Sequence, residues 1–340
     1  MLTAWSSPWP KPAKPFSWSC VTSGSRNCTA ILLCFDACAL IRPLLVAGCL
    51  LFFGAAAQAS STGYCDRPAP ANAASQHKLL RFAEIVKNEL NQSGRGLALV
   101  ARSGMDLARF DQRYSHAGFS LRESENTPWS VRQLYFSCDE GRPRIFDQGM
   151  AGFVLGGDDP KLGFVSLLFL PPETSAQLER AALDKGLVLQ MLNPQYSANA
   201  YAFGLQYQNC NQWVAEMLAA AWSGAQPSGA TEEARAQAQA WLRGQGYQPT
   251  AMELGWRPLK WLGAFIPWVH DEDHPPEDLA ALRYQVSMPS SLEAFVRAQA
   301  PATQRVELCH TETQVVIRRG WTPIAPGCVP EAQDLVLALD

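Results

Sequence analysis

The chain has 340 residues and a formal net charge of −3 at pH 7, with 47% hydrophobic and 17% charged residues. This is the composition of a globular protein with ample material for a core, and the length suits one large domain or two small ones. The lack of a basic excess argues against nucleic acid as a partner.

Residues 1–59 have the pattern of a leader. The short apolar run LLVAGCLLFF at 44–53 follows Arg42, and Ala57-Gln58-Ala59 fits the small-residue rule for signal-peptide cleavage. The run is too short for a permanent membrane helix. We therefore expect cleavage after Ala59 and a periplasmic or secreted protein. The alternative is a lipid anchor, because VAGC at 46–49 resembles a lipoprotein cleavage box.

Beyond the leader, hydrophobic periodicity predicts an α+β protein without internal repeats, in which the strands come early and the helix at Cys210 follows them. The predicted helices cover residues 76–91, 171–186 (with Gly186 just past its end), a stretch that begins at 210, and 231–243. The predicted strands cover residues 97–101, 114–122, 129–136, 144–149, 164–170, 305–310 and 314–319. Strand 164–170 is apolar enough to be central in a sheet.

Loss of the leader would remove four of the 28 basic residues and one of the 31 acidic ones, which leaves a net charge of −6 and five of the ten cysteines. In an oxidising compartment an odd number of cysteines leaves one thiol to explain. Cys309 and Cys328 flank a strand-turn segment and are expected to pair, and a Cys65–Cys138 bridge would tie the mature N-terminus to the sheet. Cys210 is then the odd cysteine. The alternative is that all five are reduced and buried.

Cys210 stands where a polar loop turns into an amphipathic helix. Asn209 is a favoured N-cap residue, and Gln212 three positions later completes a variant of the capping box. Cys210 would then be the first helical residue, near the positive end of the helix dipole, where the nucleophilic thiolate is favoured. Val214 and Met217 follow on the same helical face, so the sulfur should face the sheet.

A thiolate nucleophile needs a base within hydrogen-bond reach. His116, in the predicted strand SHAGF, has small neighbours, and Ala117 and Gly118 leave room for a helix to approach. HDEDH at 270–274 could suggest zinc, but two prolines follow immediately and would break a helix. A solvated acidic loop is expected there, and neither a metal nor a cofactor is expected in the protein.

These motifs resemble the circularly permuted papain-like (NlpC-type) cysteine hydrolases, in which the histidine strand precedes the cysteine helix. NCNQWV is also similar to a helix start of the lecithin retinol acyltransferase group. More closely, residues 96–319 resemble a bacterial exported family described as a domain of unknown function, through YSHAGFSLR, PWSVRQLYF, FDQG, YQNCNQWVAEML, MPSSLEAF and VVIRRGW. The resemblance implies a catalytic domain at 60–225, with an antiparallel sheet and a nucleophile helix, and a C-terminal extension at 226–340 that packs on it.

The resemblance also implies roles for single residues. Cys210 would be the nucleophile, His116 the general base and acid, and Gln133 the neutral group that orients the imidazole. The Cys210 N–H, with the side chain of Gln206 or Tyr207, would stabilise the oxyanion. The structural alternatives are a core cysteine, a buried strand histidine and a surface glutamine.

Two functions follow from these expectations. The first is an exported cysteine hydrolase that cleaves an amide or ester through an acyl-enzyme, with a cell-wall peptide or an acyl group as substrate. The second is a non-catalytic module for binding or assembly in the cell envelope, built on the same scaffold. The reactivity of the Cys210 thiol distinguishes the two.

Overall fold

The computed structural model describes residues 72–224, 229–255 and 266–339, which all belong to one compact unit spanning Ser60–Asp340. The predicted leader, its cleavage site after Ala59 and Cys65 lie outside the described residues. None of the described helices is both long and apolar enough to cross a bilayer. The protein has a mixed α+β fold, as predicted, built around one large antiparallel sheet.

The large sheet has eight strands in the order β10-β9-β8-β5-β1-β2-β3-β4. Every neighbouring pair is antiparallel. The strands are β1 (Leu97–Arg102), β2 (His116–Leu121), β3 (Ser130–Ser137), β4 (Arg142–Gln148), β5 (Gly163–Phe169), β8 (Gln304–His310), β9 (Gln314–Arg319) and β10 (Leu335–Ala338).

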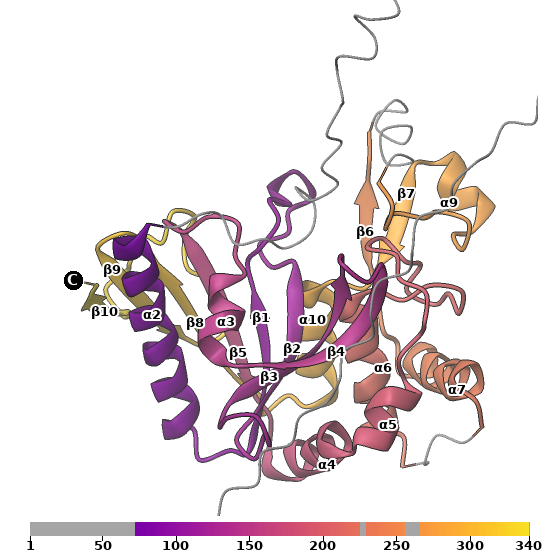
Figure 1. Ribbon diagram of the computed structural model, residues 1–340, viewed down its shortest axis with the longest axis horizontal. Coiled ribbons are helices and arrows are strands. Elements are labelled where there is room, and N and C mark those ends of the chain that lie inside the picture. The colour runs from indigo at the N-terminus through magenta and orange to yellow at the C-terminus, as the bar shows by residue number, and fades with distance from the viewer. Residues whose placement is uncertain (1–71, 225–228, 256–265, 340) are drawn as a thin grey trace, which may run out of the picture. The chain divides into compact units, whose positions relative to one another are not determined.

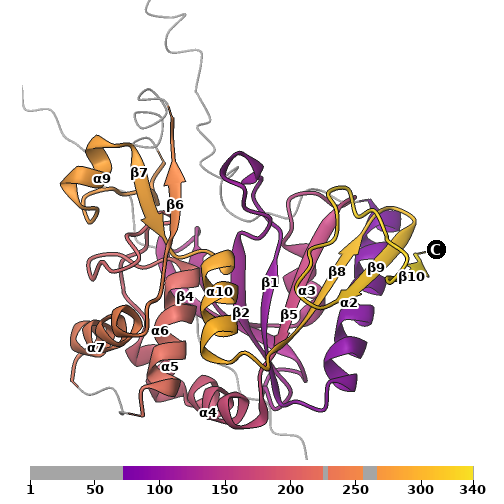
Figure 2. The ribbon, with the colours of Figure 1, turned by 180° about the vertical axis from the view of Figure 1, so that it is seen from behind.

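Helices cover both faces of this sheet. Figures 1 and 2, which view the molecule from opposite sides, show α2 and α3 on one face and α6 and α10 on the other. The described helices are α2 (Ala73–Gln92), η2 (a 3-10 turn, Ala108–Phe110), α3 (Met150–Leu155), α4 (Pro172–Leu183), α5 (Lys185–Gln190), α6 (Cys210–Trp222), α7 (Thr231–Gly244), α9 (Pro276–Ala280) and α10 (Pro289–Gln299).

The two covered faces explain why β1 is buried along its whole length. Side chains alternate across a strand. Leu97, Leu99 and Ala101 therefore join the apolar cluster that contains α6, while Ala98 and Val100 join the cluster that contains α2. A strand buried on both sides reads as a continuous apolar run, as it does in this sequence.

Strand β5 lies in the middle of the sheet, as its apolar sequence predicted. It pairs with β1 on one side and with β8 on the other, where Phe164 is opposite Cys309. The last third of the chain thus contributes β8, β9 and β10 to the same sheet as β1–β5. The expected boundary between residues 225 and 226 falls inside the single compact unit.

A small second sheet pairs β6 (Thr250–Glu253) with β7 (Arg283–Val286). Its apolar side packs around Tyr284, Val286 and Met288. The loop before α6 is attached to β7, because Tyr201 forms an isolated bridge with Val286 and the Ala202 N–H donates to the Gln285 carbonyl at 2.9 Å. This sheet therefore helps to position the segment that leads to Cys210.

Several elements differ from the sequence prediction. The helix expected over residues 171–186 is two helices, because the Asp184 side chain accepts a hydrogen bond from the Leu187 N–H at 3.1 Å and starts α5. Gly186 consequently lies inside α5. Among the described elements, those that were not predicted are η2, α3, α5, α9, α10, β6, β7 and β10.

The disulfide predicted between Cys309 and Cys328 is confirmed, with a Cα–Cα distance of 5.7 Å. Cys138 is also disulfide-bonded. Its predicted partner, Cys65, lies outside the described residues. Among the cysteines that the structure describes, Cys210 is the one that remains a thiol.

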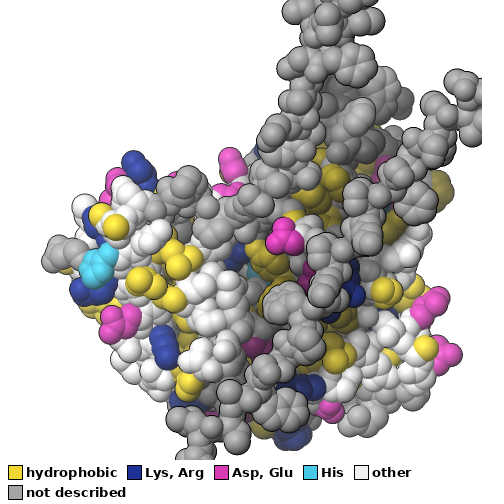
Figure 3. Space-filling model, in the orientation of Figure 1, with side chains coloured by type: hydrophobic (Ala, Val, Ile, Leu, Met, Phe, Trp, Pro, Cys, Tyr) yellow, Lys and Arg dark blue, Asp and Glu magenta, His cyan; other side chains and the backbone are white. Residues whose placement is uncertain are grey.

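On the face seen in Figure 3, acidic and basic side chains are interspersed among hydrophobic and uncharged ones.

Candidate active site around Cys210

Helix α6 begins at Cys210, and Asn209 caps it as predicted. The Asn209 backbone is extended, and its side-chain oxygen accepts a hydrogen bond from the Gln212 N–H at 2.6 Å. The reciprocal half of the predicted capping box does not form. The Gln212 side chain instead donates to the Gly204 carbonyl at 3.1 Å and to Glu216 Oε1 at 3.2 Å. The cap is therefore a single Asn hydrogen bond, which typically contributes about 1 kcal/mol.

Cys210 lies at the end of α6 and against the core. Its side chain is 8% exposed and belongs to the same apolar cluster as Val214 and Met217. The macrodipole at a helix N-terminus favours an anion by about 0.3–1 kcal/mol, whereas burial disfavours one. A thiolate in this position therefore depends on a cationic partner as well as on the helix end.

His116 is the first residue of β2, and a chain of two glutamines holds its ring. His116 Nε2 lies 2.6 Å from Gln133 Oε1, and Gln133 Nε2 donates to Gln148 Oε1 at 2.7 Å. An amide oxygen only accepts, so Nε2 carries the proton and Nδ1 carries the lone pair of the neutral imidazole. The structure thus places Gln133 in contact with His116, as expected, and adds Gln148, which was not predicted.

Gly118 has a different purpose from the one expected. A Cβ at this position would lie 2.7 Å from Val131 Cγ1, 2.8 Å from the Arg132 carbonyl and 3.1 Å from Gln133 Cβ. The glycine therefore permits the close approach of β2 and β3. Ala117, on the other face of β2, is the residue that packs in the same cluster as α6.

Cys210 and His116 line one pocket. Its cavity volume is about 80 Å³, which is smaller than a typical ligand site and suits a small group of a substrate. The other lining residues that the structure describes come from β3, from the loops that precede β2, α6 and α9, and from the turn after β3: Met105, Ser115, Leu134, Tyr135, Phe136, Cys138, Tyr196, Ala198 and Trp268.

The two side chains predicted to support an oxyanion lie elsewhere. Gln206 is exposed, and Tyr207 stacks on the His270 ring with centroids 4.6 Å apart. Neither is among the residues that line the pocket. The reason is local: the main-chain carbonyls of Leu205, Gln206 and Tyr207 are tied down by side chains from other elements. The N–H groups of the first turn of α6 are the hydrogen-bond donors that the fold places next to Cys210 for an oxyanion.

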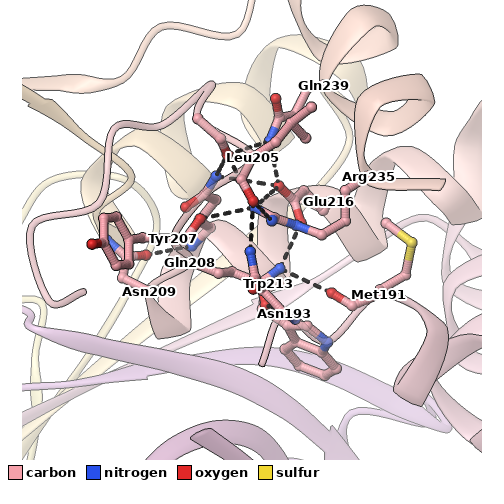
Figure 4. A network of polar contacts seen from close by, with 12 residues as sticks. Met191, Asn193, Leu205, Tyr207, Gln208, Asn209, Trp213, Glu216, Arg235 and Gln239 are labelled. Atoms are coloured by element: carbon pink, nitrogen blue, oxygen red, sulfur yellow. Dashed lines mark hydrogen bonds and ion pairs between the residues drawn. The ribbon is translucent and has the colours of Figure 1, made fainter. Parts of the chain in front are cut away.

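A buried ion pair anchors the loop that leads to Cys210 (Figure 4). Arg235 of α7 and Glu216 of α6 pair at 2.8 Å, and their side chains are 1% and 0% exposed. Glu216 Oε2 also accepts from Gln208 Nε2 at 2.6 Å. Arg235 donates to the carbonyl of Leu205 at 2.8 Å, and also to those of Gly204 and Tyr207. The ion pair therefore fixes the chain close to the thiol, because Gln208, which bonds Glu216, precedes Cys210 by two residues.

Two further side chains complete this network. Gln239 Nε2 donates to Glu216 Oε1 at 2.8 Å and to the Gly204 carbonyl at 2.9 Å. Asn193 bonds the residues that these charged groups hold. Its main-chain N–H donates to Gln208 Oε1 at 2.9 Å, and its Nδ2 donates to the Leu205 carbonyl at 2.7 Å. A glutamate inside an otherwise apolar helix is the sequence signal for such a network, since a buried charge needs partners.

Two of the other histidines, His310 and His274, are buried. His310 is buried against Phe82, with ring centroids 4.7 Å apart, and burial lowers its pKa. The segment at 270–274 is only in part the solvated loop that was expected, because Glu272 is exposed but two of its neighbours are not. His274 and the side chain of Asp273 are buried, His274 Nε2 bonds the Asn199 carbonyl at 2.7 Å, and Asp273 accepts from the Tyr201 N–H at 2.9 Å.

No group of three or more His, Cys, Asp or Glu side chains suited to a metal ion occurs among the residues that the structure describes. The structure brings together a thiol at the start of a helix and an imidazole held by a glutamine, and both residues line one pocket.

Residues 89–296 match the model of a family described as an uncharacterised protein conserved in bacteria, DUF2145. The match includes His116, Gln133, Gln148, Cys210 and the Glu216–Arg235 pair. No curated protein and no solved structure matches the chain.

Proposed function

The chain belongs to the bacterial family DUF2145, and on the geometry of its Cys210 pocket we propose that it is a cysteine hydrolase that cleaves an amide or an ester. The observation that carries the proposal is that Cys210 and His116 line the same pocket while Gln133 holds the His116 ring at 2.6 Å. We also propose that the core is a circularly permuted papain-like one, because the histidine strand β2 precedes the cysteine helix α6 in the chain.

The reaction would proceed in two steps. In the first, His116 Nδ1 accepts the Cys210 proton, and the sulfur attacks the carbonyl carbon of the substrate. The C–N or C–O bond then breaks, and the imidazolium gives its proton to the leaving amine or alcohol. In the second, His116 takes a proton from water, whose oxygen attacks the thioester. The C–S bond then breaks, the carboxylic acid leaves, and the His116 imidazolium returns its proton to the Cys210 sulfur.

The surroundings supply the rest of this mechanism. Gln133 and Gln148 keep the proton on His116 Nε2, so that Nδ1 is the basic nitrogen. The N–H groups at the start of α6 would stabilise the oxyanion. Because both glutamines are neutral, they stabilise the imidazolium less than a carboxylate would.

The neutral glutamine pair also favours a second candidate, a binding or assembly module of the cell envelope that keeps the scaffold without catalysis. For either candidate we propose a periplasmic or secreted protein, with lipid anchoring as the alternative. Disulfides at Cys138 and at Cys309–Cys328 support an oxidising compartment.

Alkylation of Cys210 by iodoacetamide at mildly acidic pH tests the proposal. An ordinary thiol, with a pKa of about 8.5, is almost wholly protonated and slow under these conditions. We expect rapid labelling of Cys210, read by peptide mass, and a loss of about two orders of magnitude in rate for His116→Ala. His77→Ala, at an exposed site on α2, is the matched control and should label at the wild-type rate. Labelling no faster than an exposed thiol, and insensitive to His116, would favour the binding module.

A further inference from the structure

The wall of the Cys210 pocket carries no charge among the residues that the structure describes. Its side chains are apolar, aromatic or hydroxyl-bearing, apart from the His116–Cys210 pair and the disulfide-bonded Cys138. Two of the described ion pairs, Arg235–Glu216, which holds the loop before α6, and Arg132–Asp147, between β3 and β4, include no described residue that lines the pocket.

Four aromatic rings from distant parts of the chain line this wall. Phe136, at the end of β3, stacks on Tyr196 with centroids 5.1 Å apart and an interplanar angle of 29°. Phe136 also contacts Trp268, with centroids 5.9 Å apart. Tyr135 lies edge-on to His116, at 5.8 Å between centroids. Because Tyr135 and Phe136 are consecutive in β3, the rings form two groups, one beside the imidazole and one around Phe136.

Such a wall discriminates by charge. A carboxylate or ammonium group that entered it would lose its hydration without gaining a counter-charge, whereas an apolar group would gain from burial. The disposition of the rings beside Cys210 and His116 means that this applies to the part of the substrate next to the bond that breaks.

We infer that the site takes an uncharged, apolar acyl group, so that the acyl-enzyme is a thioester of Cys210 with a neutral hydrophobic acid. The inference rests on the proposed cysteine hydrolase function and narrows its substrate class. Peptide stems whose acyl part carries a free carboxylate are excluded from the pocket. A neutral acyl group joined to an amine or an alcohol is accepted.

Two p-nitrophenyl esters of similar length, hexanoate and the half-ester of adipic acid, test the inference on the full chain. They differ in one terminal carboxylate. We expect acylation of Cys210, read as an acyl mass on its peptide and as release of p-nitrophenol, to be at least about tenfold faster with hexanoate. Cys210→Ala should show no acyl mass with either ester.

A charge placed on the wall should reverse part of this preference. Met105 lines the pocket and is 44% exposed, so it tolerates substitution. Met105→Lys should raise the rate with the adipate half-ester and lower the hexanoate-to-adipate ratio, while Met105→Leu should keep the wild-type ratio. Unchanged circular dichroism in both variants shows that the fold is intact.

The inference is overturned if the half-ester reacts as fast as hexanoate, or if Met105→Lys leaves the ratio unchanged. It is also overturned if neither ester acylates a Cys210 that iodoacetamide labels rapidly. Slow iodoacetamide labelling that ignores His116→Ala is a different result, because it refutes the hydrolase itself. The two failures are therefore distinguishable.

Discussion

Replacement of Glu216 by glutamine removes a charge from the centre of the protein without changing its volume. The Glu216 carboxylate accepts five hydrogen bonds, from Gln208, Gln212, Gln239 and twice from Arg235. In the variant the Arg235 guanidinium, whose side chain is 1% exposed, loses its counter-charge and keeps only neutral acceptors, namely the amide oxygen at position 216 and main-chain carbonyls. An uncompensated buried charge of this kind costs about 3–5 kcal/mol.

This loss is a large fraction of the total stability, since domains of ordinary size unfold at a cost of about 5–15 kcal/mol. Urea unfolding followed by circular dichroism measures it as a lower midpoint. Glu232→Gln, at an exposed site on the same helix as Arg235, is the control and should change stability by no more than about 0.5 kcal/mol. The double variant Glu216→Gln/Arg235→Met should recover part of the loss, because it removes the stranded charge.

The result also bears on the thiol. The carboxylate holds Gln208, two residues before Cys210, so iodoacetamide labelling of folded Glu216→Gln should be slower than in the wild type. A loss of stability below about 1 kcal/mol for Glu216→Gln, or no recovery in the double variant, would refute the view that a buried ion pair fixes this loop.

Three other predictions concern separate parts of the molecule. Gln148→Leu leaves Gln133 Nε2 without its acceptor and should slow Cys210 alkylation about fivefold, the equivalent of the roughly 1 kcal/mol of one hydrogen bond, while Gln148→Glu restores the rate because a carboxylate also accepts. Removal of the Cys309–Cys328 bridge by a double Ala substitution should cost about 3 kcal/mol in urea unfolding, from the 19-residue separation that it closes. Burial lowers the pKa of His310 below 6.5, so the unfolded chain binds a proton that the folded one does not, and stability should fall as the pH decreases from about 6.5 towards the folded pKa. His310→Gln should reduce this pH dependence, and an unaltered slope would contradict the assignment.

Local sequence rules were sufficient for the elements that carry the thiol and the imidazole. Asn209 and the apolar face after Cys210 predicted the start of α6, and alternation predicted β2 and β3. Gln133 was found because it lies on the strand next to His116. The expectation that Gly118 makes room for a helix was wrong. A glycine in a strand can allow the close approach of a helix or of a neighbouring strand, and here it allows the approach of β3.

Contacts that depend on register or on packing between helices were missed. Gln148 approaches Gln133 because β4 pairs with β3 in a register that sets Val131 opposite Gln148, and no local pattern specifies that register. Glu216 and Arg235 lie on different helices, 19 residues apart in the chain. The family resemblance implied oxyanion roles for Gln206 and Tyr207, but a loop fixed by its carbonyls directs their side chains elsewhere.

The place of β5 has a consequence for how the protein is made. One long edge of β5 stays without hydrogen-bond partners until β8 is available, and β8 begins at Gln304, more than a hundred residues downstream. A nascent chain that ends before β8 thus presents an exposed apolar edge, a feature that invites misassociation. Closure of the sheet comes late, when nearly the whole polypeptide has left the ribosome. Until then the edge of β5 that pairs with β8 stays exposed, and we expect holdase chaperones to bind there.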